Sequence, residues 1–176
     1  SPPVRYTGSK WRIAPWVISH FPAHVCYVEP FCGAAGVFFQ KPRSTVECIN
    51  DLNGEVTNFF KVLRDNMAEL IRLIEYTPYS RHELQSALVR CDEPLERARR
   101  FIVRSRQSFT SGEAEKSRGW RFEINRDSCI DEWNKVSHLH VAAKRLKSVF
   151  IEHDAALSVI KRFDDTDTLF YCDPPY

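Results

Sequence analysis

Two short segments of this chain combine side chains that could hold a flat, polar ligand. The first, Asp173-Pro174-Pro175-Tyr176, places a carboxylate, two prolines and an aromatic ring in succession. Proline has no amide hydrogen, so the carbonyl of Pro174 stays free as an acceptor. Asp173 and this carbonyl could accept both hydrogens of a planar amino group while Tyr176 stacks on the ring that bears it. The structural alternative is a Pro-Pro turn that ends an edge strand.

The second segment is a turn with two glycines, Glu29-Pro30-Phe31-Cys32-Gly33-Ala34-Ala35-Gly36. Glycine permits a tight turn and lets a ligand approach the backbone closely. Asp51 follows Gly33 by 18 residues, where an acid can accept hydrogen bonds from ribose hydroxyls. Paired glycines alone are common in loops, but together with the acid they indicate an adenosine-containing ligand.

Short apolar runs that alternate with helical patterns must position these residues. We expect strands near 25–29, 45–49, 149–152 and 168–172. We expect helices near 11–20, 37–39, 54–75, 131–146 and 155–163, two more within 80–109 that are broken near 92–94, and a loop or hairpin at 110–129. This order predicts an α/β fold with a mostly parallel, helix-covered sheet, in which ligands bind beyond the carboxyl ends of the strands. Both segments and Asp51 lie at such ends, and the helical block at 60–147 reads as an insert.

Charge is concentrated in that block. The chain has a formal net charge of +2, but residues 97–126 hold nine Lys/Arg against three acids, so this window is +6 and the remainder is −4. A localised basic block indicates a polyanionic partner, whereas a solvated helix face is the simpler alternative. Aromatic residues within the block suit stacking at a base step. Our candidates for DNA contact are Arg100, Arg104, Arg106, Arg118, Trp120 and Arg121.

Other features narrow the class of protein. With 43% hydrophobic and 27% charged residues the chain is typical of a globular domain. It has no apolar run long enough for a bilayer and no signal-peptide pattern, so we expect a soluble, cytoplasmic protein. The six cysteines lack zinc spacing and we interpret them as reduced, structural thiols. His138 and His140 cannot share one helix face, and we interpret both as surface residues, so no metal is expected.

Five motifs together resemble the Dam-like class of adenine-specific DNA methyltransferases, which includes phage and prophage members. Asp-Pro-Pro-Tyr is the signature of amino-methyltransferases that act on nucleic-acid bases. The other four are the aromatic-to-lysine stretch 6–10, the glycine motif 28–38, the ribose stretch 50–53 and a further cofactor motif at 150–154. Together they span the full chain in the family's order.

The resemblance implies a Rossmann-like fold that binds S-adenosyl-L-methionine (AdoMet) and methylates the exocyclic amine of adenine in double-stranded DNA after base flipping. It implies a catalytic domain at 1–59 and 148–176 around a helical target-recognition insert at 60–147. Catalysis would use Asp173, Pro174 and Tyr176. The AdoMet contacts it implies are Tyr6, Lys10, Glu29, Pro30, Phe31, Gly33, Gly36, Asp51, Asp154 and Asp173. A link to restriction–modification or to a prophage follows from the same likeness.

The chain departs from the family pattern in three places. Tyr6 stands where Trp is usual, Ser9 where Gly is common, and the family continues beyond the tetrapeptide with a loop and further strands. The C-terminal part of the usual sheet is therefore expected to be absent, leaving an edge that self-association or a missing segment would cover.

Alternatives to an adenine methyltransferase remain open. One is a cytosine amino-methyltransferase, and another is a truncated, silent AdoMet- or DNA-binding module. A protein-glutamine methyltransferase would carry Asn in place of Asp173. A nicotinamide dehydrogenase would not explain the two prolines.

Overall fold

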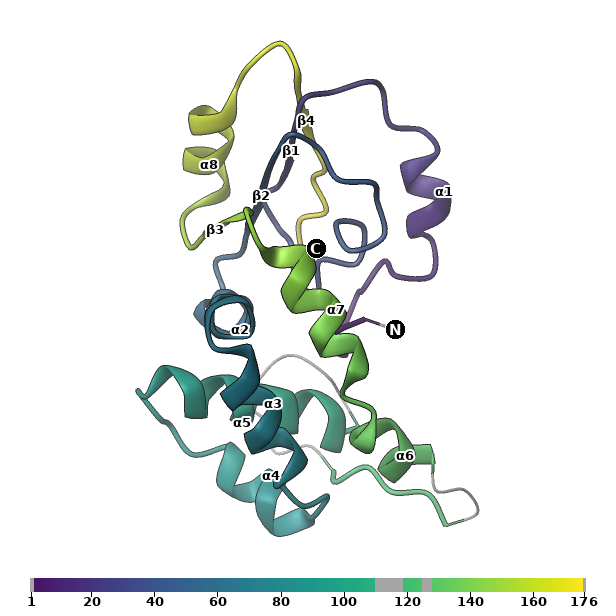
Figure 1. The fold of residues 1–176 in the computed structure, drawn as a ribbon, viewed down its shortest axis with the longest axis vertical. Coiled ribbons are helices and arrows are strands. Elements are labelled where there is room, and N and C mark those ends of the chain that lie inside the picture. The colour runs from purple at the N-terminus through teal and green to yellow at the C-terminus, as the bar shows by residue number, and fades with distance from the viewer. Residues whose placement is uncertain (1, 110–118, 125–127, 176) are drawn as a thin grey trace.

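The core of the molecule is a four-stranded parallel sheet with the strand order β3-β2-β1-β4 (Figure 1). The strands are β1 (Cys26–Glu29), β2 (Val46–Asn50), β3 (Phe150–Glu152) and β4 (Thr168–Phe170). In the central pair Cys26 lies opposite Val46, and on the other side of β1 it lies opposite Thr168. The computed structural model describes residues 2–109, 119–124 and 128–175. The predicted parallel α/β sheet is confirmed within these ranges.

The two faces of the sheet are covered by different helices, because successive residues of a strand point to opposite sides. Tyr27 and Ile49 join the main apolar core, which includes α2 (Gly54–Asp65) and α7 (Ser137–Leu146). Val28 and Cys48 face the other side and pack against Val159 of α8 (Ala156–Phe163). The short helix α1 (Ala14–Ile18) contributes Ala14 to the main core. A layered, doubly covered sheet results.

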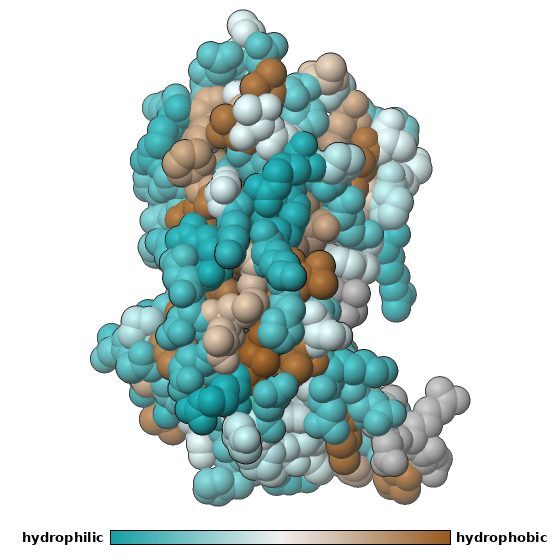
Figure 2. Space-filling view, viewed as in Figure 1, coloured by the Kyte–Doolittle hydropathy of each residue, from teal (hydrophilic) through white to brown (hydrophobic). Residues whose placement is uncertain are grey.

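Helix α7 illustrates how amphipathic spacing fixes a helix on this core. Its inner residues, Leu139, Ala142, Ala143 and Leu146, are buried, and they recur at three- and four-residue intervals. Mainly hydrophilic surface covers the region of α7 on the face of the molecule seen in Figure 2. None of the helices in the described ranges is both long and apolar enough to span a membrane.

The lower half of the molecule in Figure 1 is helical. It contains α3 (Met67–Glu75), α4 (Arg81–Ala87), α5 (Pro94–Gln107) and α6 (Ser128–Asn134). Ser80 caps α4 through Glu83 N, Glu93 caps α5, and Pro94 occupies the first turn, where its missing amide hydrogen costs nothing. The ring centroids of Phe59 in α2 and Phe101 in α5 lie 5.5 Å apart and anchor the two helices on each other.

Several predicted helices are corrected by the structure. The expected helix at 54–75 is two helices, because Asn66 leaves the helical region with φ −135° and ψ 44°. The expected helix at 131–146 is likewise divided into α6 and α7. The expected short helix at 37–39 is a series of turns, which follow left-handed backbone at Gly33 (φ +48°) and Ala35 (φ +51°).

The predicted boundary between catalytic domain and insert falls inside a helix. Residue 60 lies in the middle of α2, which runs unbroken from the end of the ribose stretch into the helical half. Helix α7, from the predicted insert, packs on α2 and on α3. The division into 1–59, 60–147 and 148–176 therefore stays a prediction.

Candidate functional site

The residues predicted to bind ligands or take part in catalysis lie together at the carboxyl edge of the sheet. Glu29 is the last residue of β1, Asp51 follows β2, and Asp173 lies just beyond β4. Tyr171 N donates to Val28 O at 2.9 Å, so the chain after β4 continues alongside β1. Because the strands are parallel, three segments distant in the sequence end side by side.

Asp51 joins the ends of two loops through its carboxylate. Its Oδ2 accepts from Gly33 N at 2.8 Å, and its Oδ1 accepts from Asn53 N at 2.8 Å. A carboxylate has about four lone-pair sites, so both oxygens keep capacity for hydroxyl donors. The glycine turn and Asp51, which the sequence analysis assigned to one ligand site, are therefore in direct contact. It holds the carboxylate in one orientation at the carboxyl edge.

The two glycines make room for the protein's own N-terminal segment. A Cβ on Gly33 would lie 3.2 Å from Tyr6 Cδ1 and Cε1, and one on Gly36 would lie 3.0 Å from Trp11 N. Sequence reasoning had assigned this close approach to a ligand. In the structure Tyr6 and Trp11 lie in this space, so the two glycines allow segment 6–11 to pack against the turn. Trp11 gave no signal in the sequence, because its partner is remote in the chain.

Lys10 connects the N-terminal segment to the proline tetrapeptide. Its Nζ lies 2.6 Å from Asp173 Oδ2, and the two side chains are 25% and 27% exposed. The same Nζ donates to Gly8 O at 3.0 Å. Pro174 is exposed at the end of this segment, and Tyr176 lies outside the described residues. Predicted residues from both ends of the chain thus meet at one point.

Glu29 lies beneath the turn and is only 1% exposed. Its Oε1 accepts from Tyr27 OH at 2.7 Å and from Phe38 N at 2.6 Å. Burial raises the pKa of this carboxyl to about 7; the hydrogen bonds from Tyr27 and Phe38 oppose the shift, and the charge of Asp173 adds to it. The carboxyl group therefore shapes the turn from within.

Asn50 fixes the loop after β3 against the turn after β1. Its Nδ2 donates to Pro30 O at 2.8 Å and to Asp154 O at 3.0 Å, and its Oδ1 accepts from Asp154 N at 3.0 Å. Asn50 is buried, and Pro30 beside it is buried as well, whereas Phe31 is half-buried. Sequence reasoning gave Asn50 no role of its own. The signal in the sequence that could have identified this role is a polar residue at the buried end of a predicted strand.

The carboxylate of Asp154 is engaged locally. Its Oδ1 accepts from Ala155 N at 2.7 Å and its Oδ2 from Arg162 Nη2 at 2.9 Å. The hydrogen bond from Ala155, followed by that from Arg162, lowers the pKa of the group. Its backbone is held at the predicted cofactor edge, while its side chain faces α8.

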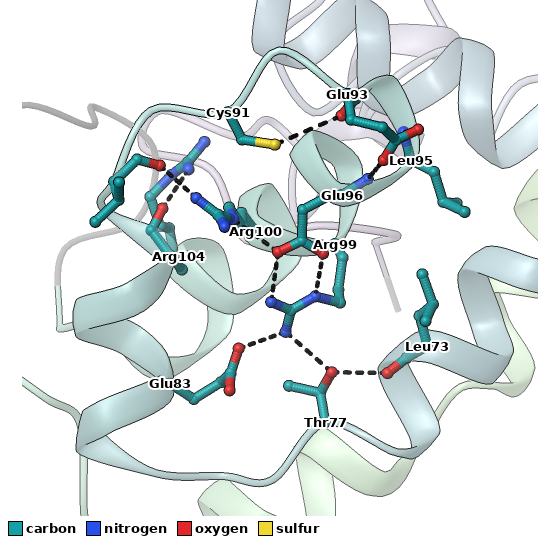
Figure 3. Close-up of polar contacts among 12 residues, drawn as sticks. Leu73, Thr77, Glu83, Cys91, Glu93, Leu95, Glu96, Arg99, Arg100 and Arg104 are labelled. Carbon is teal, nitrogen blue, oxygen red and sulfur yellow. Dashed lines mark hydrogen bonds and ion pairs between the residues drawn. The ribbon is translucent and has the colours of Figure 1, made fainter.

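Most arginines of the basic block have carboxylate partners. Arg104 Nη2 donates to Glu55 Oε2 at 2.7 Å, and Arg100 Nε donates to Glu96 Oε1 at 2.7 Å. Arg99 lies between Glu96 and Glu83 (Figure 3). Hydrogen bonds from Arg99 and Arg100 lower the pKa of Glu96 to about 2. Glu55, Glu83 and Glu96 all lie outside the window 97–126, so counting charges within the window overstated its free positive charge.

Arg106 lies in the interior and is 4% exposed. Its Nη2 donates to Pro3 O at 3.1 Å and contacts His138 Nε2, and its Nη1 donates to the carbonyls of Glu132 and Lys135 at 3.4 Å. Burial lowers the pKa of Arg106 to about 10, and burial together with Arg106 lowers that of His138 to about 4. Both histidines were interpreted as surface residues: His138 is half-buried beside Arg106, and His140 is exposed. A cavity of about 390 Å³ lies beside this cluster.

The predicted hairpin has a paired base. Ser108 and Trp120 form an antiparallel bridge, Phe109 N donates to Gly119 O at 3.1 Å, and Arg121 N donates to Gln107 O at 2.8 Å. The rings of Trp120 and Phe122 stack with centroids 5.5 Å apart. The base of the hairpin therefore continues directly from the end of α5.

Charged groups flank the aromatic pair at this hairpin base. The guanidinium of Arg81 lies 5.2 Å from the centre of the Trp120 ring. Arg121 pairs with Glu132 at 2.7 Å. Arg118 lies outside the described residues. Among the residues that the structure describes, no three His, Cys, Asp or Glu side chains are grouped as a metal site requires.

Comparison with known proteins gives a consistent family likeness. The family model described as D12 class N6 adenine-specific DNA methyltransferase matches residues 6–176. A DNA adenine methylase of Salmonella typhimurium is 23% identical over 186 residues, covering 98% of this chain and 64% of the relative. The DNA adenine methylase of Escherichia coli K12 is 21% identical with the same coverage. A DNA N-6-adenine-methyltransferase of Escherichia phage P1 is 24% identical over 98% of this chain and 23% of its own length. The chain thus spans 64% of the first two relatives.

Proposed function

Because the chain belongs to the D12 class N6 adenine-specific DNA methyltransferase family, we propose that it transfers the methyl group of AdoMet to the exocyclic amine of adenine in double-stranded DNA. The observation that carries this proposal is the ion pair between Lys10 and Asp173 beside the loops of Gly33 and Asp51. Through this ion pair, the tetrapeptide and the residues predicted to bind AdoMet share one edge of the sheet.

The charges at this edge fit AdoMet, which carries a sulfonium and an ammonium beside a carboxylate. Carboxylates of Asp51 and Asp173 suit the cationic groups, and Lys10 suits the anionic one. When bound, AdoMet supplies an electrophilic methyl group. Asp51, held by two backbone amides, is the acceptor that we assign to the ribose hydroxyls.

Further donor contacts follow from the positions of the neighbouring segments. We assign Tyr6, Pro30, Phe31, Gly33 and Gly36 to the wall of the donor site. The backbone of Asp154 would border the adenine, because its side chain is bound to Arg162. Glu29 would support the turn from below, since its oxygen Oε1 is occupied by Tyr27 and Phe38.

Asp173 and the Pro174 carbonyl would accept the two hydrogens of the target amine. Lys10 holds Asp173 Oδ2, which leaves Oδ1 as the acceptor for the amine. This arrangement would align the nitrogen lone pair and stabilise the positive charge that develops on the amine. The target base must leave the helical stack to reach the pocket, and Tyr176 would then stack on it.

DNA recognition is assigned to the hairpin base and its neighbours within 60–147. Exposed Phe109 and Phe122, 60% and 48% exposed, lie beside the Trp120–Arg81 contact and suit stacking or wedging at a base step. Arg100, Arg104, Arg118, Trp120 and Arg121 remain our candidates for DNA contact. Arg106 is left out because it is buried and holds three backbone carbonyls.

The test is Asp173→Ala in the full-length protein, with Asp65→Ala as a control of the same residue type on the surface of α2. Methyl incorporation into unmethylated genomic DNA is measured with labelled AdoMet, and AdoMet affinity is measured by calorimetry. We expect Asp173→Ala to lose turnover while AdoMet binding stays measurable. Full activity in this variant would refute the assignment.

Product analysis tests the choice of base and separates an enzyme from a silent binding module. Digestion of the methylated DNA by the wild type should yield N6-methyladenine. N4-methylcytosine would favour a cytosine enzyme. Binding of AdoMet and DNA without any methylated nucleoside would favour the silent module.

A further inference from the structure

One carboxylate, that of Glu55, joins the predicted AdoMet loop to the helix that carries the hairpin. Glu55 Oε1 accepts from Arg97 Nε at 3.0 Å and from Arg97 Nη2 at 2.7 Å. Its Oε2 accepts from Arg104 Nη2 at 2.7 Å. The two arginines are seven residues apart on α5, about two helical turns, and so share one face. Both oxygens of a single side chain are therefore bound to α5.

On one side, Glu55 lies in the first turn of α2, next to the loop that presents Asp51. Glu55 N donates to Asn53 Oδ1 at 3.0 Å, and Asn53 N donates to Asp51 Oδ1 at 2.8 Å. Asp51 in turn holds Gly33. A displacement of the first turn of α2 would therefore reach the carboxylate assigned to the ribose.

On the other side, α5 ends at the base of the hairpin. Gln107, the last residue of α5, accepts from Arg121 N, and its own side chain is bound to Ser80 N and Pro78 O. Arg104 also donates to Ala87 O at the end of α4. The hairpin base, α4 and Glu55 are thus attached to one rigid helix.

The ion pairs of Glu55 with Arg97 and Arg104 form a clamp between α2 and α5. A contribution to stability alone does not account for this clamp. Apolar packing, such as that of Phe59 on Phe101, already joins α2 to α5. The side chain of Glu55 is 29% exposed, and ion pairs with such access to water stabilise a fold little. What the clamp adds is orientation, because it fixes the first turn of α2 relative to α5.

We propose that Glu55 is a positioning residue that couples DNA binding at the hairpin base to AdoMet affinity at the Asp51 loop. The proposal rests on the proposed function above, because it assigns AdoMet and DNA to these two regions. DNA bound at the hairpin base would shift α5, and the clamp would pass the shift to the Asp51 loop. Coupling of this kind is reciprocal, so AdoMet would change the affinity for DNA by the same factor.

The experiment measures binding of sinefungin, a non-reactive AdoMet analogue, to the full-length protein with and without a duplex that the wild type methylates. For the wild type we expect the two dissociation constants to differ by about 5-fold or more. In Glu55→Gln, which keeps the size of the side chain but not its charge, the ratio should fall to about one. Adding Arg97→Gln to that variant should leave the ratio near one, since the clamp is already broken.

Glu69→Gln is the matched control, because Glu69 also pairs with an arginine but is exposed on α3. It should keep the wild-type ratio. A Glu55→Gln protein that is less stable yet keeps the ratio would overturn the coupling role, as would a wild type whose ratio is one. A wild type that binds no sinefungin at all would instead refute the proposed function.

Discussion

Lys10 Nζ and Asp173 Oδ2 lie 2.6 Å apart, so an ion pair joins the first loop of the chain to the last. The lysine is also held by Gly8 O, and Tyr6, on the same loop, rests on Gly33. Segment 6–11 therefore works as a strap across the carboxyl edge of the sheet. Its anchors, the glycine turn and the tetrapeptide, are the two motifs that the proposed chemistry requires.

Lys10→Met should distinguish the effect of the ion pair on the orientation of Asp173 from its effect on the stability of the fold. We expect the methylation rate to fall by roughly 100-fold, because Asp173 loses the partner that fixes its orientation. The free energy of unfolding should change by only about 1 kcal/mol or less, since the pair is partly exposed. Single-turnover rates and urea denaturation check both expectations. An unchanged rate would show that the ion pair has no part in positioning Asp173.

Gly33→Ala should weaken AdoMet binding and lower stability through two effects. The backbone is left-handed there (φ +48°), which costs an L-residue about 1–2 kcal/mol, and the new Cβ would meet the Tyr6 ring. Gly8→Ala is the matched control, because Gly8 also has positive φ (+79°) but nothing lies within 4 Å of its Cβ position. Thermal unfolding of both variants isolates the cost of the contact. Equal losses of stability in the two variants would mean that the Tyr6 ring moves aside at no energetic cost.

Glu29 should make stability depend on pH. Its pKa in the folded protein is about 7 against an ordinary 4.5, so between these values the folded state binds the proton that the unfolded state has released. Stability from this group is therefore present below about pH 4.5 and is lost as pH rises to about 7, by roughly 3 kcal/mol. Glu29→Gln keeps an acceptor for Tyr27 and Phe38 but cannot titrate.

The measurement is the difference in unfolding free energy between wild type and Glu29→Gln, followed by urea denaturation from pH 4.5 to 8. Taking the difference cancels the other titrating groups, including His138. The wild type should lose stability relative to the variant as pH rises. A constant difference across this range would contradict a raised pKa.

Arg106→Gln should act on folding rather than on DNA. The guanidinium is buried and donates to the carbonyls of Pro3, Glu132 and Lys135. Removing it should cost about 2 kcal/mol or more, because buried acceptors lose their donors. Arg90→Gln, whose side chain is 90% exposed between α4 and α5, is the comparison and should change stability little. Weaker DNA binding by Arg106→Gln at unchanged stability would return Arg106 to the DNA surface.

The sequence by itself determined the parallel sheet and the position of Gly33, Asp51 and Asp173 at its carboxyl edge. These features depend on short apolar runs and on residues close to strand ends, and such signals are local. Local spacing was less informative for helix boundaries. The break at Asn66 and the turns at 37–39 depend on the backbone angles of single residues.

Only the tertiary structure decided which charges are free and which groups touch. Arg104 finds Glu55, Arg106 finds Pro3 and His138, and Lys10 finds Asp173, each across a long stretch of chain. No periodicity encodes such partners, because they depend on how α5, α2 and the N-terminal strap pack together in space. The physical reason is that burial and pairing are properties of the packed molecule, whereas charge and spacing are properties of the chain.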